Sequence, residues 1–238
     1  MAAAPSAVPQ RTLFDPARLE GADTVVYERP FRFLIARGQL PDDAARELEA
    51  DFPRYSGAGF FPHDPKDCGP SINALIDDLT NPAVASAVGA KLGIDRLGQF
   101  PVLVTLCRSL NRRHGTIHTD SQSKVATALL YLNASWPDTS DGCLRFLGRI
   151  DDIDSTVAPE LKPLYGNLVV FRRADNSFHG HLPYEGERRV IQVAWLTSEE
   201  EKQRKTRRGR LSRLFKKIFG GLDRKLGAGR DKNASHGG

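Results

Sequence analysis

The stretches Ala126-Thr-Ala-Leu-Leu-Tyr-Leu132 and Arg189-Val-Ile-Gln-Val-Ala-Trp-Leu196 decide the fold class of this chain. Both are short runs rich in β-branched, aromatic and other apolar residues, which is typical of buried strands. Turn residues separate them from similar runs at residues 102–106, 143–146 and 167–171. Several short strands at fairly regular spacing indicate a mainly β sandwich or barrel.

The part of the chain before these strands has a different pattern. It predicts helices around residues 41–52, 71–79 and 81–92, and one strand at 31–35. A proline opens the first of these helices and acidic residues follow it, as is common in a first helical turn. Residues 53–70 are rich in Gly and Pro and predict a loop.

Charge divides the chain into a body and a tail. The formal net charge is +5, but the residues from Lys202 to the end carry a net +11 and the first 201 residues a net −6. We therefore expect a flexible N-terminal arm over 1–22, a helical part over 23–100, a β core over 101–197 and a basic tail over 198–238. The basicity belongs to the tail and not to the body.

The tail also contains a regular apolar pattern within residues 202–222. Six apolar residues recur there at steps of three and four: Leu211, Leu214, Phe215, Ile218, Phe219 and Leu222. This spacing predicts a helix with one apolar face and basic residues on the rest. Such a helix can lie in an anionic membrane surface, or it can pack on the acidic body or on a protein partner. Nucleic acid fits less well, because phosphate contacts leave the apolar residues unexplained.

The three cysteines, Cys68, Cys107 and Cys143, are widely spaced and form no CxxC pair. They predict neither a zinc site nor a disulfide framework, and a reducing compartment suits them. The sequence has no secretory signal at its start and no apolar run of about 18 residues. We expect a cytoplasmic protein, and the membrane interpretation of the tail would place it peripherally on the inner face of the membrane.

His118-Thr119-Asp120 is the segment that points to chemistry. Residues i and i+2 of a strand face the same side, so this histidine and this carboxylate can approach one metal. A second histidine would complete a set that leaves positions on Fe(II) open for oxygen and an organic co-substrate. His179 and His181 both qualify, because strand alternation does not separate them. His114 competes with His118 but has no Asp at the same offset.

An arginine can hold a carboxylate of such a co-substrate as a bidentate pair. Arg188 and Arg189 are adjacent in a predicted strand, so only one of them can enter the pocket.

The ordered set of motifs resembles one enzyme family. After HxD come Tyr131-Leu-Asn133, then Gly142-Cys-Leu-Arg145, then Gly166-Asn-Leu-Val-Val-Phe171, and finally the histidine and arginine segments. Over about 101–197 this order resembles the Fe(II)- and 2-oxoglutarate-dependent dioxygenases, and in particular the catalytic domain of prolyl 4-hydroxylases. The resemblance implies a double-stranded β-helix, or jelly roll, that is mainly β with flanking helices.

The resemblance also implies roles for individual residues. His118, Asp120 and His179 match the Fe(II) ligands, with the family spacing favouring His179 over His181. Tyr131 and Arg189 match the residues that bind the distal carboxylate of 2-oxoglutarate. Arg189 is preferred because it is in phase with Trp195, which leaves Arg188 as an expected surface charge. O2 is the second co-substrate, and ascorbate is expected as a reductant.

These roles imply hydroxylation of an unactivated C–H bond, with release of succinate and CO2. The substrate can be a prolyl residue of a protein, or a membrane-associated glycan, lipid or small metabolite, since fold does not decide substrate. Two other functions stay open. A binding module on an inactive jelly roll predicts broken ligands, whereas all five expected residues are present. A zinc hydrolase with the same ligands leaves Arg189 and Tyr131 without a role.

Overall fold

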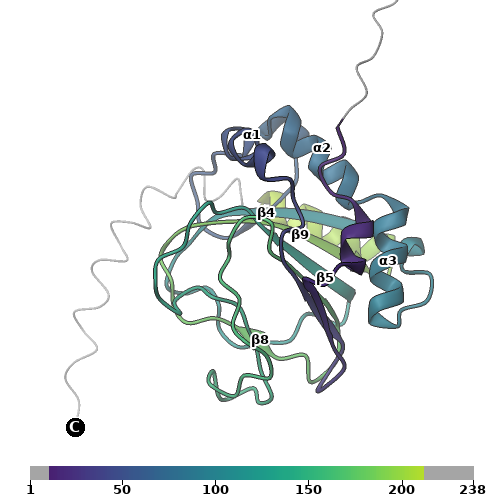
Figure 1. Cartoon of the computed structure of the whole chain (residues 1–238), viewed down its shortest axis with the longest axis vertical. Helices are drawn as coiled ribbons and strands as arrows, with labels where there is room; N and C mark the ends of the chain where they lie inside the picture. The colour runs from purple at the N-terminus through teal and green to yellow at the C-terminus, as the bar shows by residue number, and fades with distance from the viewer. Residues whose placement is uncertain (1–10, 212–238) are drawn as a thin grey trace, which may run out of the picture.

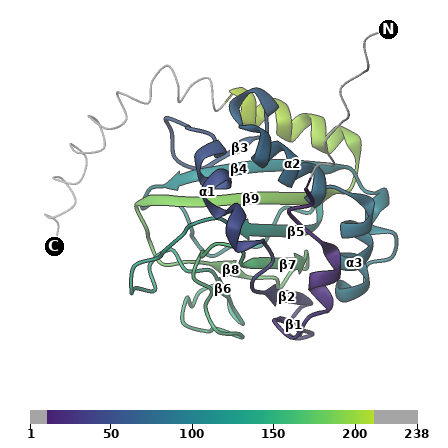
Figure 2. The ribbon, with the colours of Figure 1, turned by 45° about the horizontal axis from the view of Figure 1, so that its top comes forward.

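A computed structural model describes residues 11–211 and shows a seven-stranded antiparallel sheet with helices on one face (Figure 1). The strand order is β1-β2-β7-β5-β9-β4-β3, which Figure 2 shows from β1 at the bottom to β3 at the top. The strands of this sheet are β1 (Thr24–Tyr27), β2 (Phe33–Ala36), β3 (Phe60–Pro62), β4 (Val102–Leu110), β5 (Lys124–Tyr131), β7 (Leu168–Arg172) and β9 (Gly186–Leu196). A second sheet pairs β6 (Arg145–Phe146) with β8 (His179–Gly180).

Apart from a helix over 199–211, the helices of the described residues lie before the central strands in the chain. They are α1 (Ala45–Asp51), α2 (Pro70–Leu79), α3 (Pro82–Leu92) and the short 3-10 turns η1 (Pro16–Glu20), η2 (Asp42–Ala44), η3 (Pro65–Asp67) and η4 (Leu97–Gln99). The last two predicted helices are confirmed, and the first is present as η2 followed by α1. Asn81 caps α3 by accepting a hydrogen bond from the amide of Ala83 at 2.9 Å.

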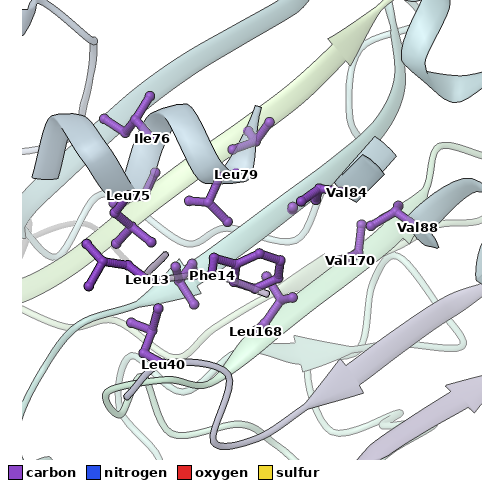
Figure 3. Close-up of a cluster of buried hydrophobic side chains, with 14 of the residues drawn as sticks. Leu13, Phe14, Leu40, Leu75, Ile76, Leu79, Val84, Val88, Leu168 and Val170 are labelled. Atoms are coloured by element: carbon purple, nitrogen blue, oxygen red, sulfur yellow. The ribbon is translucent and has the colours of Figure 1, made fainter. Parts of the chain in front are cut away.

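Buried side chains pack on both faces of the large sheet. On the helix face, Leu75 and Leu79 of α2 and Val84 of α3 meet Leu168 and Val170 of β7 (Figure 3).

The alternate residues of the same strand, Val169 and Phe171, point to the other face and pack with Tyr131 and with Phe146 of β6. The large sheet and the smaller β6–β8 sheet thus enclose the second cluster, as expected for the double-stranded β-helix. The predicted fold class is confirmed.

Three expectations about segments need correction. The N-terminal arm is not flexible from residue 11 onward, because Leu13, Phe14 and Leu19 are buried. The amides of Leu13 and Phe14 also donate to Asp78 Oδ2, at 2.6 and 3.1 Å. The predicted loop over 53–70 contains the edge strand β3, and β1 and β8 were not predicted as strands.

The described part of the tail is a helix over 199–211. Leu211 is half exposed, at 50%. The other residues of the predicted apolar stripe lie outside the described residues: Leu214, Phe215, Ile218, Phe219 and Leu222. Within residues 11–211 no helix has the length and apolarity needed to span a bilayer.

Candidate iron and co-substrate site

The fold brings His118, Asp120 and His179 together. Each offers a ligand atom, and these atoms lie within 4.8 Å of one another. The amides of His118 and His179 donate to each other's carbonyl oxygens, both at 3.0 Å, so an antiparallel bridge joins the two segments. Their ring centroids are 4.4 Å apart. Backbone pairing therefore supplies the distant histidine that the local HxD segment lacks.

Both histidines present the nitrogen that a metal needs. Nδ1 of His118 lies 2.8 Å from the carbonyl oxygen of Thr116, and Nδ1 of His179 lies 2.9 Å from that of Ser177. A carbonyl oxygen only accepts, so each Nδ1 carries the proton and each Nε2 keeps a free lone pair. Burial lowers the pKa of His179 to about 4, although Asp120 opposes the shift, so this ring is neutral near pH 7.

Asp120 is held as an ionised carboxylate. Burial disfavours its charged form, but Lys124 and His179, together with hydrogen bonds from Lys124 and Thr127, lower its pKa to about 2. Lys124 Nζ donates to Oδ1 at 2.8 Å, and Thr127 Oγ1 donates to Oδ2 at 2.5 Å. Both donors lie on β5, which fixes the carboxylate against a rigid strand. Two neutral imidazoles and one oriented carboxylate fit Fe(II).

Arg188 and Tyr131 form a second feature on the same side of the large sheet. Arg188 is only 3% exposed. It donates through Nη2 to Tyr131 Oη at 3.2 Å and through Nε to the Gly142 carbonyl oxygen at 3.0 Å. Its guanidinium carbon lies 5.0 Å from the centroid of the Tyr131 ring. Within residues 11–211 no carboxylate comes within 4.0 Å of Arg188, which is unusual because buried charges are normally paired. An unpaired buried guanidinium is suited to an anionic ligand.

The prediction that Arg189 enters this pocket and that Arg188 is a surface charge is wrong. Arg189 forms ion pairs with Glu49 of α1 and with Glu187, both at 2.8 Å. Arg189 does share the side of β9 that carries Trp195, but Trp195 belongs to the cluster beneath the helices. The same parity holds for Ile191 and Val193, so the apolar periodicity of β9 was the signal that assigns Arg189 to the helix face.

The competing histidines lie outside the triad. The ring of His181 packs against Gly115, and burial followed by the nearby Arg188 lowers its pKa to about 4. His114 turns its Nδ1 to the carbonyl oxygen of Asn111 at 3.2 Å. Of the described residues, His179 is the histidine that joins the HxD pair. The supporting roles of Lys124 and Thr127 had no sequence motif to reveal them.

Comparison with known proteins points to the same chemistry. Residues 105–197 match the family model described as the 2OG-Fe(II) oxygenase superfamily. No curated protein sequence matches the chain.

Solved structures with similar folds include three prolyl hydroxylases. One from Pseudomonas putida is 21% identical, with a TM-score of 0.47, covering 70% of this chain and 92% of that one. One from Trichoplax adhaerens, in complex with a hypoxia inducible factor peptide fragment, is 15% identical, with a TM-score of 0.47 and coverage of 79% and 89%. A viral collagen prolyl hydroxylase from Paramecium Bursaria Chlorella virus-1 is 16% identical, with a TM-score of 0.49 and coverage of 72% and 96%.

Proposed function

We propose that this chain, whose residues 105–197 match the 2OG-Fe(II) oxygenase superfamily model, hydroxylates an unactivated C–H bond of an organic substrate. The enzyme is an oxidoreductase of the dioxygenase class. In the proposed reaction, the substrate C–H, 2-oxoglutarate and O2 give the substrate C–OH, succinate and CO2. One oxygen atom enters the product hydroxyl group and the other enters succinate.

His118, Asp120 and His179 are the residues that would hold Fe(II), through two Nε2 atoms and one carboxylate oxygen. Bound iron supplies the activation of O2. The protein positions these three ligands. The carbonyl oxygens of Thr116 and Ser177 orient the two imidazole rings, and Thr127 of β5 orients the Asp120 carboxylate.

Arg188, in place of Arg189, and Tyr131 bind the distal carboxylate of 2-oxoglutarate in this proposal. The observation that carries it is the buried Arg188, which touches Tyr131 and has no acidic partner among the described residues. A zinc hydrolase or an inactive binding module would not need the Arg188 guanidinium, whose burial destabilises the protein.

For the substrate, a prolyl residue in a protein is the first candidate. A glycan, a lipid or a small metabolite held at a membrane is the alternative. Ascorbate as a reductant and a cytoplasmic location stay predictions.

Anaerobic titration with Fe(II) and then 2-oxoglutarate tests the site before any substrate is known. We expect a weak visible charge-transfer band in the wild-type protein and none in Asp120→Ala. Succinate release is then screened with peptides, saccharides and lipids in parallel. No band in the folded wild-type protein, or substrate-stimulated succinate release by Asp120→Ala, would sink the assignment.

A further inference from the structure

The helix over 199–211, drawn yellow-green in Figure 2, continues directly from β9 and packs on the body along one face. Lys205 Nζ donates to Ser121 Oγ at 2.9 Å. A Cβ on Gly209 would lie 2.5 Å from Cγ of Pro62, so the helix approaches the edge strand β3 closely. The face of the helix toward the body is therefore polar or small, and its position beside the sheet is fixed.

The opposite face is basic and points to solvent. Arg204, Arg207, Arg208 and Arg210 are all exposed. Arg204 pairs with Glu201 of its own helix. Within residues 11–211, the other three have no acidic group within 4.0 Å, although the body is acidic overall. The arginine face therefore does not pair with acidic groups of the body. An anionic partner outside the protein would account for these exposed arginines.

We propose that this arginine face docks the protein on an anionic lipid membrane. Arg207, Arg208 and Arg210 supply fixed positive charge for lipid phosphates and carboxylates. The sequence continues with Arg213, Lys216 and Lys217 among the apolar residues Leu214, Phe215, Ile218 and Phe219. A bilayer interface accommodates both kinds of residue, whereas the phosphates of a nucleic acid engage only the basic ones.

Docking through this helix would also bring the candidate active site close to the membrane surface. Lys205 contacts Ser121, which directly follows the candidate iron ligand Asp120. The loop that carries this ligand therefore lies beside the helix, and a docked helix brings the loop close to the bilayer. This orientation rests on the proposed function, whereas the docking itself rests on the exposed arginines and on the basic and apolar residues that follow them in the sequence.

The test is co-sedimentation of the full chain with vesicles of phosphatidylserine and phosphatidylcholine, and with phosphatidylcholine alone, at two salt concentrations. The combined variant Arg207→Glu, Arg208→Glu and Arg210→Glu should lose binding by on the order of 100-fold. A matched control replaces three other exposed arginines by Glu, with the same change in net charge: Arg29, Arg37 and Arg46. Thermal unfolding checks that both variants stay folded.

We expect the wild-type protein and the control to bind anionic vesicles in a salt-sensitive way, and the helix variant to bind on the order of 100-fold more weakly. Equal binding by the helix variant, equal loss in the control, no binding of the wild type to anionic vesicles, or tighter binding to duplex DNA would each overturn the proposal. Asp120→Ala should bind vesicles as the wild type does. Vesicle binding thus succeeds or fails independently of the hydroxylase assignment.

Discussion

Replacing Arg188 or Arg189 by methionine gives opposite effects on stability and on co-substrate binding. Methionine has a similar length but no charge, so each substitution removes the guanidinium and leaves an apolar side chain in its place. For Arg188 we expect weaker binding of 2-oxoglutarate without loss of stability. For Arg189 we expect the reverse, since its partners are Glu49 and Glu187 and not the pocket.

The magnitude for Arg188 follows from its burial. Removing one partner of a buried, hydrogen-bonded charge pair costs about 2–5 kcal/mol. Since about 1.4 kcal/mol is a factor of ten in Kd, the Kd for 2-oxoglutarate should rise at least about 30-fold. The ligand-free protein should keep or raise its melting temperature, because a buried charge without a counter-charge is removed.

The magnitude for Arg189 follows from the exposure of its partners. Glu49 and Glu187 have side chains that are 48% and 45% exposed, so each ion pair is screened by solvent. Such pairs contribute about 0.2–1 kcal/mol each. Arg189→Met should therefore lower the melting temperature by about 2–4 °C and change the Kd for 2-oxoglutarate by less than about threefold.

The assay is anaerobic titration of the Fe(II) protein with 2-oxoglutarate, followed through the charge-transfer band, with thermal unfolding of the metal-free protein alongside. No substrate is needed, so the result does not depend on the open question of what is hydroxylated. The reasoning is refuted if Arg188→Met leaves the Kd unchanged, or if Arg189→Met raises it as much.

Three further perturbations probe the site and the core. The metal-free protein should lose stability as the pH falls from about 6.5 to about 4, because His179 stays neutral when folded while the unfolded chain takes up a proton over that range; a flat profile of thermal midpoints between those values contradicts this. Leu75→Ala should cost about 2–5 kcal/mol in urea unfolding, whereas Val25→Ala, at 43% exposure, should cost less than about 0.5 kcal/mol, and similar losses would show that the core is misassigned. Gly142→Ala should destabilise the protein by about 1 kcal/mol or more, because φ of Gly142 is +72° and a Cβ would lie 2.9 Å from Trp136. It should also weaken 2-oxoglutarate binding, because the Gly142 carbonyl oxygen accepts a hydrogen bond from Arg188. An alanine variant with wild-type stability and Kd would oppose that account.

The central strands were predictable because their residues are buried on both faces. In β5 and β7 nearly every position is apolar, so a continuous run marks the strand. β1 and β3 are runs of only four and three residues, too short to mark a strand by themselves, and Val25, Val26 and Phe60 are exposed at the edges of the sheet. They are strands because neighbouring strands pair with them, and a pairing partner is not visible in a local pattern.

The site residues likewise fall into those that a local pattern predicts and those that depend on tertiary contacts. His118 and Asp120 are close in sequence, so a two-residue spacing predicted that they share a face. His179 was predicted only through the family resemblance, because it meets the HxD segment through a bridge at β8 that no local pattern reveals. Lys124 and Thr127 act on Asp120 through side-chain geometry and lie four and seven residues from it, in no recognised motif.

The adjacent arginines show how one strand serves two layers. β9 pairs with both β4 and β5, so it is an interior strand of the large sheet. Its successive side chains must therefore enter different environments: Arg188 faces Tyr131, and Arg189 faces α1. Arg189 ties the helical layer to the strand that carries the proposed co-substrate anchor. The helices thereby support the pocket without lining it, and a weakened Arg189–Glu49 pair should loosen the protein before it changes affinity for 2-oxoglutarate.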